Sequence, residues 1–145
     1  SIKFNEISLP KTGQKIFVMG YPISSILGRF NPSITEGIIS KNRGFGELPG
    51  EFQITAPMNK GNSGGPIFNA NGEIVGISVA GLDKITIMKE DGFSPQDVNL
   101  GISSEVLKTF LNQPTKASIS NKKGSFDASQ IYQFMRPSVV FVVCQ

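Results

Sequence analysis

Histidine is absent from all 145 residues of the chain. It is the commonest general base near neutral pH and the commonest metal ligand, so neither role can come from that side chain here. The single cysteine, Cys144, has no partner in the chain, which excludes an internal disulfide framework and a multi-cysteine metal site. We therefore expect no bound metal and no other cofactor.

Long apolar runs and strong charge are also lacking. No segment approaches the roughly 20 apolar residues that a membrane-spanning helix needs, so no membrane span is expected. The net charge is only +3 and the basic residues are scattered, so no stripe could follow a phosphate backbone. Nucleic-acid binding is therefore not expected. The 16 glycines and 9 prolines instead predict a turn-rich globular domain.

Short apolar runs separated by turn residues predict a small antiparallel barrel or sandwich. The strongest hairpin signal is Asn71-Gly72, a turn dipeptide between two apolar runs. The stretch 82–98 is polar and long for a connection, so it is expected to be a surface loop. The six expected strands cover residues 15–19, 35–41, 52–56, 66–69, 73–80 and 99–102.

Helices are predicted only after these strands. Ser103 is a suitable N-cap for a helix that continues through Leu111. Asp127 and Gln130 have the spacing of a capping box and begin a second, short helix. Residues 139–143 then form a β-branched and aromatic run, which would promote aggregation if it were unpaired. We expect this run to be an extra strand, hydrogen-bonded into a sheet.

The segment 61–66, Gly-Asn-Ser-Gly-Gly-Pro, is the strongest indication of chemistry. Acyl transfer needs an exposed hydroxyl on a backbone that also directs amide groups at the developing oxyanion. Glycines on both sides of Ser63 permit the unusual dihedrals of such a turn. Ser63 is therefore the candidate nucleophile.

This segment resembles the nucleophile loop of the chymotrypsin-fold serine proteases, most closely the bacterial HtrA-like (Deg) branch. The similarity extends in order and spacing over residues 13–111. It implies an all-β domain, a mainly antiparallel six-stranded barrel that forms the second lobe of this fold, followed by a helix. The predicted units are residues 1–112 as this lobe, 113–126 as a linker, and 127–145 as a C-terminal helix-strand extension.

The resemblance also implies roles for individual residues. Backbone amides around Ser63 would form the oxyanion hole, one strand would pair with the substrate main chain, and the predicted specificity pocket is apolar and uncharged. We expect cleavage after small or medium aliphatic residues. The predicted site residues are Ser63 as nucleophile, Gly61, Asn62 and Ser63 for the oxyanion hole, and Pro57, Ser78, Val79, Ala80 and Gly101 for substrate binding.

The chain departs from the family in one respect. Complete enzymes have a first, N-terminal lobe that supplies a histidine and an aspartate, and neither its strand motifs nor any histidine is present here. A serine hydroxyl without a base is a weak nucleophile, so we expect the isolated chain to be inactive. Lys60 is a possible alternative base, but a lysine in this turn is expected to face solvent. The expected partners are a peptide or unfolded-protein substrate and the missing lobe.

Two other functions remain open at this point. A catalytically silent, protease-like module could bind peptides or proteins through the half-cleft. A terminal interaction domain could self-associate by strand exchange through residues 139–143. The retained glycine frame of Ser63 favours the peptidase, because a silent module has no physical need for it. The resemblance favours a periplasmic or secreted location, although the sequence leaves the compartment open.

Overall fold

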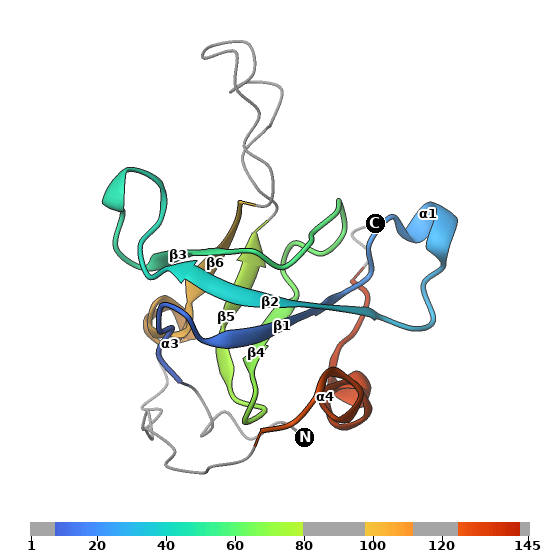
Figure 1. The fold of residues 1–145 in the computed structure, drawn as a ribbon. Coiled ribbons are helices and arrows are strands. Elements are labelled where there is room, and N and C mark those ends of the chain that lie inside the picture. Colours follow the sequence, from blue (N-terminus) through green and yellow to red (C-terminus); the bar gives the residue numbers. More distant parts are fainter. Residues whose placement is uncertain (1–7, 80–97, 112–124, 143–145) are drawn as a thin grey trace.

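The computed structural model describes residues 8–79, 98–111 and 125–142 (Figure 1). Within these ranges antiparallel strands close into a barrel in the order β1-β2-β3-β6-β5-β4. This confirms the predicted six-stranded all-β barrel. The strands are β1 (Lys15–Gly20), β2 (Ser33–Lys41), β3 (Glu51–Ile54), β4 (Pro66–Asn69), β5 (Ile74–Val79) and β6 (Asn99–Ser103).

Strand β1 is buried on both faces, which explains its continuous apolar run. Successive side chains of a strand point to opposite faces. Ile16 and Val18 accordingly join the cluster inside the barrel, whereas Phe17 and Met19 join a second cluster that also contains Ile131 of the C-terminal part of the chain. The inner cluster comprises Ile16, Val18, Ile39, Phe52, Ile54, Ala56, Ile67 and Val75.

The Asn71-Gly72 turn joins β4 to β5, as predicted. Gly72 has a φ of +78° and donates its N–H to the Asn69 carbonyl oxygen at 3.0 Å. The Asn69 side-chain oxygen accepts hydrogen bonds from the N–H groups of Asn71 and Glu73 at 2.9 and 3.0 Å. The hairpin therefore depends on one asparagine before the turn and one glycine within it. A second hairpin joins β2 to β3 and contains the 3-10 turn η1 (Phe45–Glu47) in its loop.

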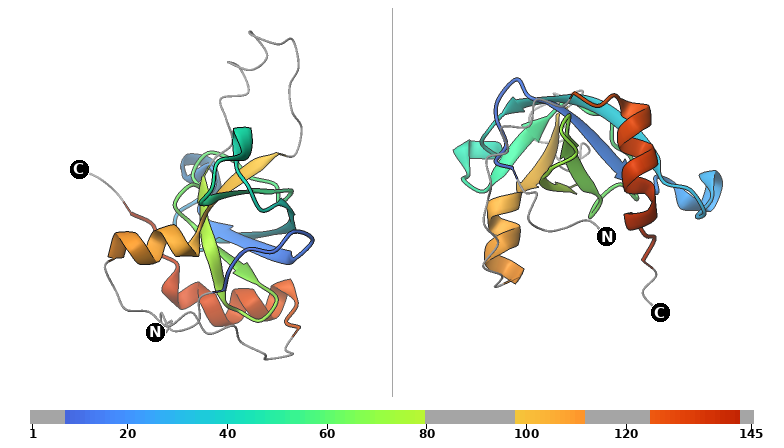
Figure 2. Two further views of the ribbon diagram at one scale, coloured as in Figure 1. Left: turned by 90° about the vertical axis from the view of Figure 1, so that its left-hand side faces the viewer. Right: turned by 90° about the horizontal axis from the view of Figure 1, so that it is seen from below.

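The two predicted helices are present and begin at the predicted caps. Helix α3 (Ser104–Leu111) packs against β5 and β6, and the Ser103 hydroxyl oxygen accepts from the Glu105 N–H at 3.3 Å. Helix α4 (Ala128–Met135) packs against β1 and β2, on another side of the barrel (Figure 2). Asp127 and Gln130 form both hydrogen bonds of the capping box, at 2.9 and 3.0 Å. The short helix α1 (Ser24–Leu27) was not predicted.

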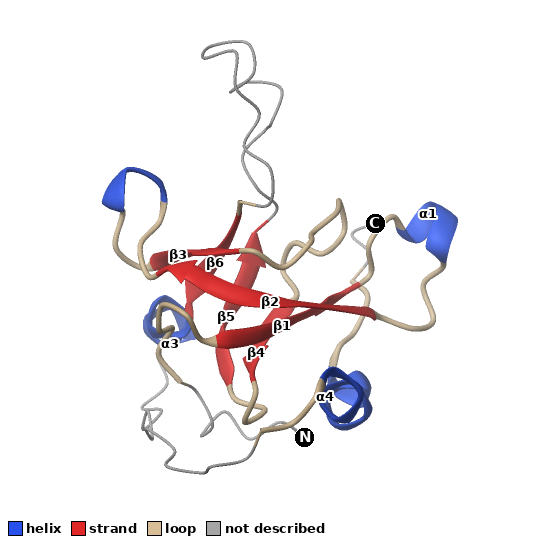
Figure 3. Cartoon of the chain, viewed as in Figure 1, coloured by secondary structure: helices blue, strands red, loops and turns tan. Residues whose placement is uncertain are grey.

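The strand predicted over residues 139–143 is wrong for the part that the structure describes. The 3-10 turn η2 (Arg136–Ser138) follows α4, and residues 139–142 are not part of the sheet (Figure 3). The barrel is already closed by the pairing of β1 with β4, so it has no free edge for a further strand. Side chains hold the segment instead: the Tyr21 hydroxyl donates to the Val139 carbonyl oxygen at 3.1 Å.

Three sequence predictions lie wholly or mainly outside the described residues: the surface loop over 82–98, the linker over 113–126, and the setting of Cys144. In the parts that are described, none of the helices has the length and apolar character needed to cross a membrane.

Candidate active site

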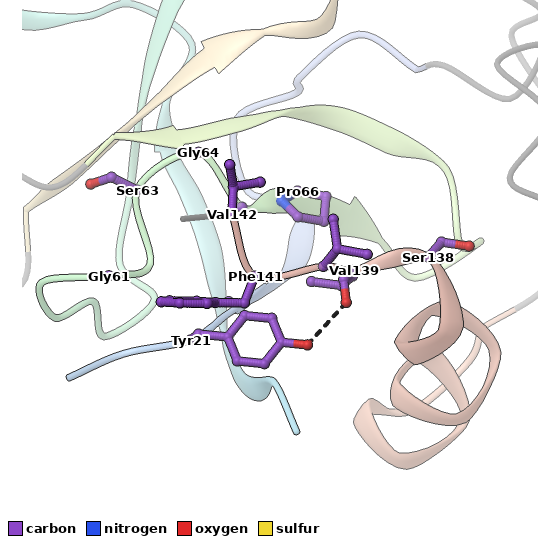
Figure 4. Close-up of a pocket in the computed structure, with 12 residues that line it drawn as sticks. Tyr21, Gly61, Ser63, Gly64, Pro66, Ser138, Val139, Phe141 and Val142 are labelled. Carbon is purple, nitrogen blue, oxygen red and sulfur yellow. Dashed lines mark hydrogen bonds between the residues drawn. The ribbon is translucent and has the colours of Figure 1, made fainter. Parts of the chain in front are cut away.

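Ser63 lies in the loop between β3 and β4, and its side chain is exposed (Figure 4). This loop is paired with β5 through two backbone hydrogen bonds. The Gly64 N–H donates to the Ser78 carbonyl oxygen at 2.8 Å, and the Ser78 N–H donates to the Gly65 carbonyl oxygen at 2.8 Å. The backbone directly after Ser63 is therefore fixed to the barrel, while the Ser63 side chain faces solvent.

The Ser78 side chain adds further hydrogen bonds between β5 and the Ser63 loop. Ser78 is 1% exposed, and its hydroxyl lies 2.5 Å from the Asn62 carbonyl oxygen and 3.0 Å from that of Gly65, so its single proton is shared between two acceptors. Both main-chain polar groups of Ser78 are also used by the loop. Ser78 thus holds the loop, and its main chain does not remain available to pair with a substrate.

Gly61 permits the loop to lie directly on the end of β1. Its φ is +103°, a conformation that side chains with a Cβ rarely adopt. A Cβ at this position would also overlap the Tyr21 carbonyl oxygen, which is rigid backbone. A Cβ on Gly65 would overlap the Met19 carbonyl oxygen in the same way. The path of the loop across β1 therefore requires glycine at both positions.

Of the three residues predicted for the oxyanion hole, Asn62 has its amide engaged within the loop. Its N–H donates to the Asn59 carbonyl oxygen at 3.0 Å, and the residue is 3% exposed. Gly61, by contrast, is exposed, and its N–H has no acceptor among the described residues. An anion beside the loop could therefore accept a hydrogen bond from the Gly61 N–H but not from the Asn62 N–H.

The predicted substrate-binding residues are not gathered in one described cavity. Val79 is half-buried at the end of β5, and Ala80 lies outside the described residues. Pro57 is exposed at the start of the Ser63 loop. Gly101 is buried, and a Cβ there would overlap the ring of Phe52 in the barrel core, so this position faces inward.

A cavity of about 460 Å³ lies beside Ser63. The Ser63 loop forms one side, and the segment after α4 forms the other, with Tyr21 between them (Figure 4). Tyr21 was not predicted as a site residue, because Gly20-Tyr21-Pro22 indicates only a turn, and no pattern in the sequence indicated that residues after α4 would line this cavity. The lining comprises residues 20, 21, 61, 63–66 and 138–142, none of which is charged.

The cavity has no donor set for a metal ion. In the chain as far as the structure describes it, no three histidine, cysteine, aspartate or glutamate side chains come together in a way that could hold a metal. The available chemistry is that of an exposed hydroxyl and backbone amides.

Residues 2–77, slightly more than half of the chain, match the family model of the trypsin-like peptidase domain. The chain belongs to this family. Ser63 lies within the matched residues, and so do the first five strands except for the end of β5. The trypsin-like peptidase domain thus accounts for most of the barrel and for the candidate loop.

Several curated proteins resemble this trypsin-like domain. A probable periplasmic serine endoprotease, DegP-like, from Brucella suis is 29% identical over 139 residues, which cover 94% of the chain and 24% of the relative. The serine protease Do-like HtrB of Bacillus subtilis is 34% identical over 84 residues, covering 52% and 18%. An uncharacterized protein, y4bJ, from Sinorhizobium fredii is 33% identical over 101 residues, covering 70% and 16%. The chain therefore spans only 16% to 24% of the length of these relatives.

A solved structure supports the same fold. The serine endoprotease from Yersinia pestis superposes with a TM-score of 0.54 at 24% identity, over 72% of this chain and 32% of that chain. Together with the family match, this confirms the predicted resemblance to HtrA-like proteases and to one lobe of the chymotrypsin fold.

Proposed function

We propose that this chain is the nucleophile-bearing lobe of a serine endopeptidase that cleaves peptide bonds through an acyl-enzyme on Ser63. Residues 1–112 form the lobe in this proposal, and 113–126 link it to the C-terminal extension. The observation that carries it is the exposed Ser63 on a loop that β5 and the end of β1 hold rigidly, in a chain of the trypsin-like peptidase family.

The proposed mechanism follows from this geometry. The Ser63 Oγ attacks the substrate carbonyl carbon while a base removes its proton, and the amides of Gly61 and Ser63 stabilise the negative oxygen that forms. The proton then passes to the leaving amine, and water hydrolyses the acyl-enzyme. Since the chain has no histidine, the base belongs to another lobe, and the isolated chain is inactive.

Substrate main chain is expected to pair beyond Ser78, at Ala80, because the loop already uses the polar groups of Ser78 and Val79 is paired with Leu100 of β6. None of the residues predicted to contact substrate is acidic. An uncharged site gives no compensation for burying a lysine or arginine side chain. In a peptide library, cleavage should follow small or medium aliphatic residues, and products ending mainly in lysine or arginine would contradict this assignment.

The test of the function is covalent labelling of the full-length protein with a fluorophosphonate. This probe forms a stable adduct only with a serine that is activated as a nucleophile. Mass spectrometry should locate the adduct on Ser63, and Ser63→Ala should not be labelled. If the wild-type protein carries no adduct, the endopeptidase proposal fails and a silent peptide-binding module becomes the better description.

A further inference from the structure

Ile23, in the connection between β1 and β2, has a backbone conformation that β-branched residues rarely adopt. Its φ is +45°, in the left-handed region. In that region the branched Cβ crowds the neighbouring backbone, so the residue is strained. Strain of this kind persists only where the surrounding structure holds the residue in place, and it concentrates at functional sites. The contacts that hold Ile23 therefore indicate what its conformation achieves.

Both main-chain polar groups of Ile23 are hydrogen-bonded. Its carbonyl oxygen accepts from the N–H groups of Ile26 and Leu27, at 2.8 and 3.0 Å, and so begins α1. Its N–H donates to the Lys60 carbonyl oxygen at 2.8 Å, which joins the connection to the Ser63 loop. The contact with the candidate site is therefore made by the main chain of Ile23, which is itself 38% exposed.

The Lys60 carbonyl belongs to the central peptide of a tight turn. The Asn62 N–H donates to the Asn59 carbonyl oxygen at 3.0 Å and closes the turn, and Gly61, its third residue, has a φ of +103°. A positive φ at this position is that of a type II turn, whereas in a type I turn the third residue has a negative φ and the central peptide faces the opposite way. Glycine adopts both signs of φ about equally, so Gly61 does not itself select the orientation of this peptide.

The hydrogen bond from Ile23 selects that orientation. No peptide bond among the described residues is cis, and in a trans peptide the C=O and N–H groups point in opposite directions. Since the Lys60 carbonyl is directed at Ile23, the Gly61 N–H is directed away from residues 21–23. Gly61 is exposed, on the same loop as Ser63 (Figure 4), and its N–H has no acceptor among the described residues. If the peptide turned over, the carbonyl oxygen would take the place of this N–H.

We propose that the Ile23 N–H is a positioning group for catalysis, which keeps the Gly61 amide directed at the substrate oxygen that becomes negative. The inference rests on the proposed function, in which that amide is one of two donors to the oxyanion. A donor fixed in advance costs no reorganisation when the negative charge forms, whereas a carbonyl oxygen in its place would repel that charge. Ile23 does not touch substrate in this proposal and acts only through Lys60 and Gly61.

A purely structural role for Ile23 predicts a different result. If the residue only begins α1 and completes the connection between β1 and β2, loss of its N–H lowers the stability of the protein but not kcat. If the N–H orients an oxyanion donor, its loss lowers kcat and leaves KM unchanged, because the interaction acts in the transition state. The two roles are separable, since the N–H of Ile23 serves the Ser63 loop and its carbonyl serves α1.

The experiment removes the donor alone. In the full-length protein the peptide bond between Pro22 and Ile23 is replaced by an ester, by incorporating the α-hydroxy acid that corresponds to isoleucine, so the side chain stays and the N–H is lost. We expect kcat for a fluorogenic peptide to fall by about 10²-fold, as when an oxyanion donor is removed, with KM unchanged. Fluorophosphonate labelling of Ser63 should slow as well, because the phosphonyl oxygen needs the same donors.

Two matched variants serve as controls. An ester between Ser25 and Ile26 removes an N–H that is bonded within the same connection, to the Ile23 carbonyl, and should leave kcat and KM at their wild-type values. Ile23→Gly keeps the N–H and adopts a positive φ without strain, so it should retain the wild-type kcat. Thermal unfolding should show that all three proteins are folded at the assay temperature.

The outcomes separate this inference from the function on which it rests. If wild-type Ser63 is labelled and the ester at Ile23 has the wild-type kcat, the positioning role is refuted while the peptidase function stands. An equal loss of kcat in the two esters would assign the effect to the connection as a whole and would overturn the role of this one hydrogen bond. If wild-type Ser63 is never labelled, the function itself fails.

Discussion

Replacing Ser63 by alanine in the full-length protein should lower kcat for peptide hydrolysis by about 10⁶-fold, the size of effect found when a serine peptidase loses its nucleophile. The loss is this large because no acyl-enzyme can form without the hydroxyl. The residual rate, about 10³-fold above that in water, would come from the oxyanion hole and substrate binding alone. Hydrolysis of a fluorogenic peptide with an aliphatic residue at the cleavage position measures the effect.

The matched control is Ser40→Ala, which removes an exposed serine hydroxyl from β2. We expect its kcat and KM to equal those of the wild type. Ser63→Ala should remain folded, because the Ser63 side chain is exposed and the loop is held through the backbone of its neighbours. Hydrolysis that survives in Ser63→Ala at more than the residual rate would assign the nucleophile to another residue.

Gly61→Ala is expected to lower the free energy of unfolding by about 2–5 kcal/mol. A residue with a Cβ at a φ of +103° is strained, and its methyl group would also overlap the Tyr21 carbonyl oxygen. Domains of this size are stable by about 5–15 kcal/mol, so the variant loses a large part of its stability. Urea unfolding followed by tyrosine fluorescence gives the difference.

Gly64→Ala separates the two causes of this loss. Gly64 also has a positive φ, +84°, but a Cβ there would meet no atom within 4 Å. Its cost should therefore be only the conformational part, about 1–2 kcal/mol. Equal destabilisation by both substitutions would show that Gly61 does not lie against β1 as described.

Features that depend on neighbours in the sequence were predicted correctly. The Asn71-Gly72 turn and the capping box of Asp127 and Gln130 are made within a few residues, so their sequence patterns suffice. Residues 139–143 failed for the opposite reason. Their composition favours a strand, but a strand needs a free sheet edge, and barrel closure by β1 and β4 removed it. Closure is a property of the whole chain.

The candidate site likewise has features that the local sequence predicts and features that depend on residues distant in the sequence. The glycines around Ser63 identify the loop, because glycine is required by the local backbone. The sequence could not show that the Ser78 hydroxyl would be buried under that loop, or that the Asn62 amide would be used by Asn59. The partners of the Ser78 hydroxyl are determined by the packing of β5 against a loop more than ten residues away, whereas the bond between Asn59 and Asn62 is a local turn that the glycine pattern does not specify. Tyr21 was missed likewise, since its partner Val139 is separated from it by 118 positions.

The place of β6 has a consequence for synthesis of the protein. Among the six strands of the barrel it is the last to leave the ribosome, yet it lies between β3 and β5 and pairs with both. Until residue 103 has emerged, the nascent sheet must keep two open edges, each able to pair with a neighbouring chain. A truncation that ends before Asn99 should therefore aggregate during translation, however well its hairpins form.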